Sequence, residues 1–366
     1  MPMTTTTEQP EKTTEFELLS RTAQKKSLVG LSFSDLKALC DQLNQPAFRA
    51  RQLHQWLYVH CVRSFDAMTN LKAAFRSQLE TLYTVGVLRI TRKEVSQDST
   101  IKYLFQLPDG NVVESVLMHF KDRDTYALCI STQVGCAVNC GFCATGKLGF
   151  SRNLSVAEIV DQYLYAQHDS QKEIRNIVFM GQGEPLLNEA NLLDAITVLN
   201  RSAEVGMRHI TISTAGIVPA IYRLAEKNLQ LTLAVSLHAP DDETREAIMP
   251  INRRWPVETL MEALKHYVDT TNRRLTIEYI LLAGVNDSPN QANALGELLN
   301  GLKCNVNLIP YNPIGASYGY SRPSGNAMHQ FKQTLSQYGK KVTLRVERGT
   351  DIAAACGQLA NKTHQA

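Results

Sequence analysis

The stretch Gln133-Val-Gly-Cys-Ala-Val-Asn-Cys-Gly-Phe-Cys-Ala-Thr-Gly146 places three cysteines in a C-x-x-x-C-x-x-C pattern directly after an apolar run. Thiolates at Cys136, Cys140 and Cys143 can bind three irons of a cubic 4Fe-4S cluster and leave the fourth iron open to an outside ligand. A structural zinc site is the alternative, but such sites usually pair C-x-x-C units around four ligands, and the only nearby candidate for a fourth is Cys129. The spacing therefore predicts a cluster with one reactive iron.

The cysteine loop follows the first of a series of β-type runs that alternate with helical patterns. The helices are marked by apolar spacing and by prolines at their starts, as after Pro256 and at Pro289. The β-type runs span residues 126–131, 174–180, 209–213, 231–237, 275–281 and 305–309, with a shorter run at 341–346. Repeated βα units indicate an α/β fold, and we expect a partial TIM-like (βα)6 barrel, with a doubly wound sheet as the alternative.

The chain before the barrel divides into three parts. A Thr- and Glu-rich tail comes first, then helical spacing around Leu36 and Leu39, and then β-type runs at 85–90, 101–107 and 112–118, the last two joined across Pro108-Asp-Gly110. The second helix of the helical part mixes basic and aromatic side chains, as RNA-binding surfaces do: Arg49, Arg51, His54 and Trp56, with His60 and Arg63 close behind. We expect a disordered tail (1–26), a helical RNA-binding accessory domain (27–84), a β-hairpin linker (85–120), the barrel (121–350) and a C-terminal segment (351–366).

Composition indicates a cytoplasmic protein. The chain has 366 residues with 44% hydrophobic content, which is ample for a packed core. No apolar run reaches the roughly 18–20 residues that a membrane helix needs. In a reducing cytosol, the eight cysteines are more plausible as ligands, reactive thiols or core residues than as structural disulfides. A net charge of +3 is too mildly basic to identify the partner.

Polar residues follow several of the predicted strands at their carboxyl ends. They are the cysteine loop, Gly181-Gln-Gly-Glu-Pro185, Ser213, Ser236, His238 and Asn312. The carboxyl ends of barrel strands form one rim, on which the active sites of TIM barrels are built. Taken alone, each has a simpler explanation: a core histidine at His238, a helix cap at Ser213 and a turn at Gly183. Together they predict one pocket, in which the Glu184 carboxylate can receive an ammonium group.

The motifs also resemble those of a known family. The C-x-x-x-C-x-x-C loop resembles the signature of the radical S-adenosylmethionine (SAM) enzymes, and Gly183-Glu-Pro185 resembles the motif with which they hold the methionine amino group. Further runs are similar to the ribosomal-RNA adenine carbon-2 methyltransferases: Arg152-Asn-Leu154, Ser236-Leu-His238, Ile309-Pro-Tyr-Asn-Pro313 and Arg348-Gly-Thr-Asp-Ile-Ala-Ala-Ala-Cys-Gly-Gln-Leu359. The similarity extends from about Gly30 to Leu359.

The resemblance implies a role for each matching residue. Cys136, Cys140 and Cys143 would ligate the cluster, and SAM would bind its open iron. The positions that would contact SAM are Gly183, Glu184, Ser213, Ser236, Leu237, His238 and Asn312. Catalysis would use Glu114 as proton acceptor, Cys356 as methyl-carrying cysteine, and Cys129 as the resolving thiol that forms a transient disulfide with Cys356. Two positions depart from the family: Gln182 replaces a usual methionine, and Ala353 stands where an aspartate is common.

The implied reaction is methylation of adenine carbon 2 in 23S ribosomal RNA, and of transfer RNA as well. That carbon is too electron-poor to attack the methyl group of SAM directly, so a radical route through a methylated Cys356, using two SAM molecules, suits it. Glu114, a lone acid in an apolar strand, suits a base whose pKa is adjusted by burial. The expected partners are these RNAs and an electron donor such as flavodoxin, and we expect a monomer.

Two alternatives remain open. A related carbon-8 methyltransferase would use the same cysteines, although the runs around Asn312 and Asp351 look closer to the carbon-2 branch. A non-catalytic zinc protein that binds RNA through its helical module ranks lower.

Overall fold

The computed structural model describes residues 25–314 and 319–361, and its strands build one ten-stranded sheet in the order β14-β13-β12-β11-β10-β9-β6-β5-β4-β3. The tail predicted for residues 1–26 lies outside the described residues except for its last two. Seven strands are parallel to one another: β6 (Thr125–Cys129), β9 (Ile174–Phe179), β10 (Ile210–Thr214), β11 (Thr232–Ser236), β12 (Leu275–Leu281), β13 (Cys304–Pro310) and β14 (Lys341–Leu344).

The order of these strands decides between the two predicted folds. Each parallel strand lies beside its predecessor in this series, as in a barrel, whereas a doubly wound sheet reverses direction at a switch point. The partial TIM-like fold is therefore confirmed, and every predicted β-type run of this region forms a strand. The parallel set has one strand more than the six expected, because the short β14 pairs with β13 from Asn305 onward.

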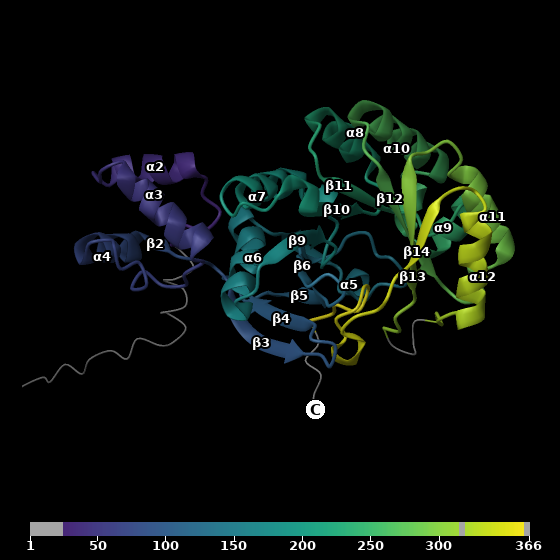
Figure 1. The fold of residues 1–366 in the computed structure, drawn as a ribbon, viewed down its shortest axis with the longest axis horizontal. Helices are drawn as coiled ribbons and strands as arrows, with labels where there is room; N and C mark the ends of the chain where they lie inside the picture. Colours follow the sequence, from purple (N-terminus) through teal and green to yellow (C-terminus); the bar gives the residue numbers. More distant parts are fainter. Residues whose placement is uncertain (1–24, 315–318, 362–366) are drawn as a thin grey trace, which may run out of the picture.

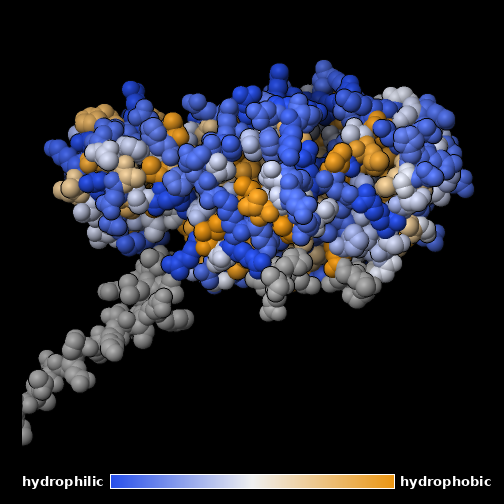
Figure 2. Space-filling model, turned by 60° about the horizontal axis from the view of Figure 1, so that its bottom comes forward, coloured by the Kyte–Doolittle hydropathy of each residue, from blue (hydrophilic) through white to orange (hydrophobic). Residues whose placement is uncertain are grey.

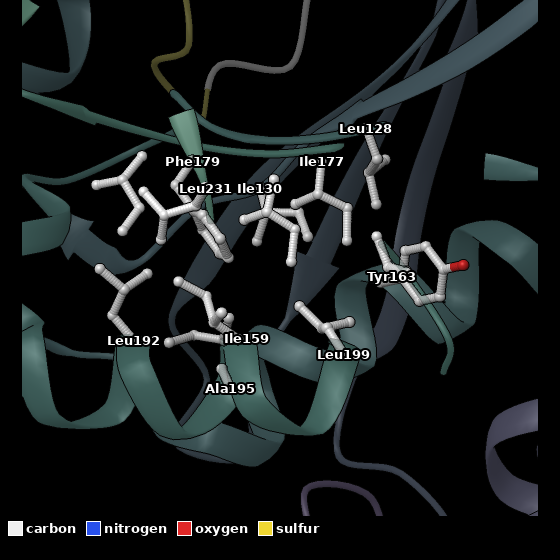
Figure 3. Close-up of a cluster of buried hydrophobic side chains, with 14 of the residues drawn as sticks. Leu128, Ile130, Ile159, Tyr163, Ile177, Phe179, Leu192, Ala195, Leu199 and Leu231 are labelled. Atoms are coloured by element: carbon white, nitrogen blue, oxygen red, sulfur yellow. The ribbon is translucent and has the colours of Figure 1, made fainter. Parts of the chain in front are cut away.

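Helices cover the outer side of the parallel strands (Figure 1). They are α6 (Val156–Ser170), α7 (Glu189–Arg201), α8 (Val218–Lys227), α10 (Val257–Thr271), α11 (Pro289–Leu298) and α12 (Gly325–Ser336). The short α9 (Asp242–Ile248) instead packs at the carboxyl ends of the strands, where the Ile248 carbonyl accepts the Gly141 N–H at 2.9 Å. A capping box between Ser155 and Glu158 begins α6. Figure 3 shows how the apolar faces of the helices meet the sheet, with Ile159 of α6 and Leu192 of α7 facing Ile177 and Phe179 of β9. This packing holds the strand ends, and hence the site, in place.

The predicted hairpin linker is part of the same sheet. Strands β3 (Arg89–Val95), β4 (Ile101–Gln106) and β5 (Val112–Phe120) are antiparallel and continue the barrel sheet from the edge of β6. The hairpin between β4 and β5 forms as predicted, but the β-type run at 85–90 is mostly not a strand. The N–H groups of Val87 and Leu88 donate to the buried Asp161 carboxylate, each at 2.8 Å, instead of to a neighbouring strand.

The N-terminal module packs at one end of the barrel (Figure 1). It contains α2 (Phe33–Gln42), α3 (Phe48–His54) continued by a π-helical turn η1 (Gln55–Val59), and α4 (Ala73–Leu82), with β1 (Lys26–Ser27) paired to β2 (Tyr83–Thr84). Two of the basic residues predicted to bind RNA make contacts within the fold. Arg63 forms an ion pair with Asp161 of α6, and the mostly buried Arg49 donates to the Asn70 carbonyl at 3.0 Å. Among the described residues, no helix is long and apolar enough to span a bilayer.

Candidate active site

The three cysteines lie in a loop that two short strands close at its base. Strand β7 (Gln133–Gly135) pairs with β8 (Phe150–Asn153), and α5 (Ala144–Lys147) follows the last cysteine. Gly135 has a φ of +73°, and a Cβ there would lie 1.8 Å from the Gly149 carbonyl oxygen, so only glycine lets the strands meet this closely. All three cysteines are free thiols packed against an apolar cluster that includes Val138 and Phe142.

The donor set of this loop fits a 4Fe-4S cluster. Burial raises the pKa of Cys136 to about 12 and also raises those of Cys140 and Cys143, so these thiols would release their protons when they bind a metal cluster. Within the described parts of the chain, no three Cys, His, Asp or Glu side chains converge closely enough to hold one metal ion. Three thiols spread around a space suit a cluster, in which each thiolate binds a different iron. Cys136, Cys140 and Cys143 would hold it.

The glycine-rich turn after β9 presents Glu184 to the same region. A Cβ at Gly183, whose φ is +102°, would lie 2.9 Å from the Gln133 backbone nitrogen. Glu184 is 3% exposed, and its carboxylate accepts the N–H groups of Ala215 at 2.6 Å and Leu186 at 3.0 Å. Burial raises the pKa of Glu184 to about 7, the backbone donors opposing this. A ligand ammonium group beside it would favour the charged carboxylate.

A small cavity of about 160 Å³ brings most of the predicted cofactor residues together. Its lining includes the three cysteines, Gly183, Glu184, Ser213, Ser236 and His238. His238 accepts the Ile280 N–H at Nδ1 (3.0 Å), so its Nε2 carries the proton. Burial, followed by the charge of Arg245, lowers the pKa of His238 to about 3, and the imidazole is therefore a neutral hydrogen-bond donor at physiological pH.

Leu237 is placed differently from its neighbours. Its side chain is fully buried in the main core rather than lining this cavity, and both of its backbone groups are engaged. The N–H donates to the Glu278 carbonyl at 3.1 Å, and the carbonyl accepts Arg245 Nε at 3.0 Å. In this structure Leu237 supports the loop that carries Ser236 and His238.

A larger cavity of about 830 Å³ adjoins the first and contains both catalytic cysteines of the prediction. Cys129, at the end of β6, and Cys356 both line it, although they are 227 positions apart in the sequence (356 − 129). Burial, with a smaller contribution from the charge of a Cys356 thiolate, raises the pKa of Cys129 to about 12. Cys356 also lines the small cavity, so it lies between the predicted cofactor site and the larger space.

The segment that carries Cys356, residues 349–361, is held down on both sides. On one side, Asp351 accepts the Ser96 hydroxyl at 2.6 Å, and on the other, the Ala144 N–H donates to the Gly357 carbonyl at 2.7 Å. Asn312 Nδ2 donates to the Cys356 carbonyl at 3.3 Å, which places this predicted cofactor residue beside the predicted methyl-carrying cysteine. Ala353 has a left-handed backbone (φ +49°), a conformation in which the aspartate common at this position is better tolerated.

Glu114 lies beside the large cavity but is covered. It shares one face of β5 with Val116 and Met118, which line the cavity, yet it is only 1% exposed. The N–H of Asn361 donates to its Oε2 at 3.1 Å. Burial raises the pKa of Glu114, opposed by the Asn361 N–H and the Lys102 charge. The C-terminal segment thus separates the predicted base from the space that contains the two cysteines.

The sequence prediction did not include the two charged residues that line both cavities. They are Glu278 of β12, which is 3% exposed and has its pKa raised by burial, and Arg345, just after β14. Arg345 Nη1 lies 3.7 Å from Glu278 Oε2. A lone acid within the apolar run Leu275–Leu281 is a signal that could have identified Glu278. The lining of the larger cavity includes the cations Lys121, Arg123 and Arg348 together with the acids Asp122 and Glu347. Figure 2 shows apolar groups within an otherwise hydrophilic surface.

Comparison with known proteins identifies the family. A model of the radical SAM superfamily matches residues 130–292, and a model of the ribosomal RNA large subunit methyltransferase N-terminal domain matches residues 26–85. The chain is 46% identical to proteins from Trichormus variabilis (92% of this chain, 94% of that protein) and Synechocystis sp. (91% and 94%), each named probable dual-specificity RNA methyltransferase RlmN.

The fold agrees with this assignment. The crystal structure of a radical SAM methyltransferase from Sphaerobacter thermophilus superimposes with a TM-score of 0.88 at 42% identity, covering 91% of this chain and 99% of that one. Membership of the superfamily implies a 4Fe-4S cluster and SAM, which the cysteine loop and the Glu184 pocket fit. The chain belongs to the RlmN family of radical SAM RNA methyltransferases.

Proposed function

We propose that this enzyme methylates carbon 2 of adenine in 23S ribosomal RNA through a methylated Cys356. The observation that carries the proposal is the position of Cys356, which lines both the small cavity with the cluster cysteines and the large cavity with Cys129. A carrier must receive its methyl group and its radical on the cofactor side and deliver them to a substrate on the other side. No other cysteine of the described chain lines both cavities except the cluster ligand Cys143.

The residues around the small cavity would bind and orient SAM. Glu184 would receive the methionine ammonium group, while Ser213, Ser236 and the Nε2–H of His238 would offer hydrogen bonds to its other polar atoms. When bound, the cluster and SAM supply a 5′-deoxyadenosyl radical, which removes hydrogen from the methyl group on Cys356. The Cys356 thiolate accepts that methyl group beforehand by displacement on a first SAM molecule.

In the large cavity, the remaining residues would complete the transfer. The Cys356 methylene radical would add to carbon 2, and the adduct would lose one electron back to the cluster and its ring proton to the Glu114 carboxylate. The Cys129 thiolate would then attack the Cys356 sulfur to form a Cys129–Cys356 disulfide, and the released CH2 carbon would take up a proton to become the methyl group. A reductant must open this disulfide before the next turnover. The high pKa of Cys129 suits a thiol that attacks only after deprotonation at the site.

The substrate assignment draws on the comparisons. The match to a ribosomal RNA large subunit methyltransferase domain supports 23S RNA, and the dual-specificity names of the relatives support a second RNA, which we take to be transfer RNA. The cations that line the larger cavity would contact phosphates, and the target base would have to leave its stack to enter. We also propose a cytoplasmic monomer that receives electrons from a donor such as flavodoxin.

The decisive experiment separates carrier from resolving thiol in anaerobically reconstituted enzyme. Cys356→Ala should retain the cluster and SAM cleavage yet form no methylated RNA, whereas Cys129→Ala should trap a covalent RNA–protein adduct that mass spectrometry detects at Cys356. Cys304→Ala is the matched control, because Cys304 is buried at the start of β13 away from both cavities, and it should behave as wild type. Full activity of Cys129→Ala would rule out the resolving role.

Product analysis distinguishes the alternatives. Digestion of modified RNA and mass spectrometry should place the methyl group on carbon 2, and a product only on carbon 8 would favour the related branch instead. Roughly four irons and four sulfides per chain are expected for the radical enzyme, whereas one zinc without sulfide would indicate the non-catalytic RNA-binding protein.

A further inference from the structure

A lysine is buried between the hairpin strands and the carrier segment. The side chain of Lys102 in β4 is 2% exposed, and lysine is almost never buried to this extent unless it is paired. Its Nζ lies 2.8 Å from Glu94 Oε2 and 3.6 Å from Glu114 Oε1, and it donates to the Ile352 carbonyl at 2.6 Å. One ammonium group therefore contacts an acid on each neighbouring strand and the backbone of the segment that carries Cys356.

The strand register produces this arrangement. Glu94 of β3 is directly opposite Lys102, whereas Glu114 of β5 is opposite Leu104, one position along the same face of β4. Lys102 thus stands between the buried Glu114 carboxylate and the Glu94 carboxylate, which is 11% exposed and also pairs with Arg92 at 2.8 Å. Without the lysine, the two acids would repel each other. Removal of Lys102 would also leave Glu114 without the cation that favours its ionised form.

The other oxygen of Glu114 is engaged by the carrier segment through Asn361. Besides the N–H of Asn361 at Oε2, a second link passes through Gln182, whose Nε2 donates to Asn361 Oδ1 at 2.8 Å and whose Oε1 accepts the Glu114 N–H at 3.2 Å. Gln182 is fully buried. It occupies the position at which the family usually has methionine, and a methionine could make neither hydrogen bond.

We propose that Lys102 is a positioning residue that couples the base Glu114 to the carrier segment. While residues 349–361 are docked, Lys102 holds Ile352 and Asn361 covers Glu114, so the base cannot reach a substrate. When Asn361 moves away, Lys102 is the partner that remains, and it keeps Glu114 ionised and oriented toward the cavity. Gln182 strengthens the docked arrangement in this chain. The inference rests on the proposed roles of Glu114 and Cys356.

The first test is the pH profile of single-turnover RNA methylation by reconstituted enzyme. The acidic limb of the profile should report ionisation of Glu114, and Lys102→Met should move it upward by about 1 to 3 pH units, because an adjacent cation lowers the pKa of a carboxylic acid by this amount. Methylation of Cys356 itself, read from the intact protein mass, should persist because it does not need Glu114. Lys93→Met is the matched control, since Lys93 lies on the opposite face of β3, pairs with the surface residue Asp169, and should leave the profile unchanged.

A second variant protects this test against misfolding. Lys102→Met alone leaves the buried Glu114 carboxylate without a cation, next to a Glu94 that keeps its ion pair with Arg92 at 2.8 Å. The double variant Glu94→Gln/Lys102→Met removes one negative charge together with the positive one. The double variant should fold, retain Cys356 methylation and still show the upward shift. If a folded variant keeps the wild-type acidic limb, or if it loses Cys356 methylation together with RNA methylation, Lys102 has only a structural role and the proposal is wrong.

Hydrogen exchange tests the docking contacts without any turnover. Gln182→Met removes the contact with Asn361 and should increase amide exchange in a peptide covering residues 352–361 several-fold, while exchange in β12 stays unchanged. Lys102→Met removes the contact with Ile352, at the other end of this peptide, and should also increase its exchange. Unchanged exchange in both variants would refute the coupling. Glu114→Gln identifies a different failure: if that variant methylates RNA at the wild-type rate, the proposed function of Glu114 is wrong whatever Lys102 does.

Discussion

Replacing Glu184 by glutamine keeps the size of the side chain but removes its charge and one of its two acceptor oxygens. In the structure, the two oxygens accept separate backbone donors, Leu186 N–H and Ala215 N–H. The single oxygen of a glutamine amide can accept a hydrogen bond from only one of these two N–H groups, and the NH₂ group of the amide then faces the second N–H group. A buried donor without an acceptor costs about 1–3 kcal/mol, and the free energy of unfolding should decrease by that amount in chemical denaturation.

The same substitution should weaken SAM binding separately. A hydrogen bond to a charged group contributes about 1.5–3 kcal/mol, which corresponds to a SAM affinity roughly 10- to 100-fold lower in anaerobic calorimetry of the reconstituted enzyme. Glu189→Gln is the control, because Glu189 pairs with Arg223 at the surface of α7 and should bind SAM normally. An unchanged SAM affinity in Glu184→Gln would refute the assignment of Glu184 as the ammonium-binding residue.

The raised pKa of Glu184 adds a pH dependence with a definite sign. The folded protein retains this proton up to about pH 7, whereas an unfolded chain loses it near 4.5, so without SAM the contribution of this group to stability decreases as the pH rises between these values. A bound ammonium group favours the carboxylate, so SAM affinity should fall as the pH drops below about 7. Glu184→Gln should lose this dependence, and a flat wild-type affinity between about pH 6 and 8 would contradict it.

Three further substitutions test the framework of the site. Asp161→Asn leaves the mostly buried Arg63 without its counter-charge and should lower the free energy of unfolding by about 3–5 kcal/mol, and a loss below about 1 kcal/mol would mean that the pair behaves like a surface salt bridge. Ala353→Gly should raise the free energy of unfolding by about 1 kcal/mol in the same assay, because it relieves a left-handed backbone at φ +49°; a decrease would be inconsistent with that strain. Gly183→Ala introduces a Cβ 2.6 Å from the Gln133 side chain and should reduce SAM binding at least 10-fold, and normal binding would show that the turn adapts.

Several features were predictable because they depend on neighbouring residues. The sequence pattern locates all seven parallel strands. Leu275–Leu281 is a nearly continuous apolar run, as expected of a strand covered on both faces, whereas β10 and β13 alternate buried with partly exposed residues. The residues at their carboxyl ends were expected to share one rim, and Glu184, Ser213, Ser236 and His238 do line one cavity. Local spacing is less informative for residues 85–90. The backbone N–H groups there donate to the carboxylate of Asp161, which lies on α6, far along the chain.

By itself, the sequence determined the cluster loop, the order of the βα units and, through its motifs, the family. Those properties follow from short-range spacing, apolar periodicity and the chemistry of single residue types. Only the tertiary structure decided that the hairpin strands continue the barrel sheet, that Leu237 lies in the core, and that Glu114 is covered by Asn361 beside a buried Lys102. These outcomes depend on contacts between residues that are far apart along the chain, and no local pattern encodes which distant partner satisfies a buried charge.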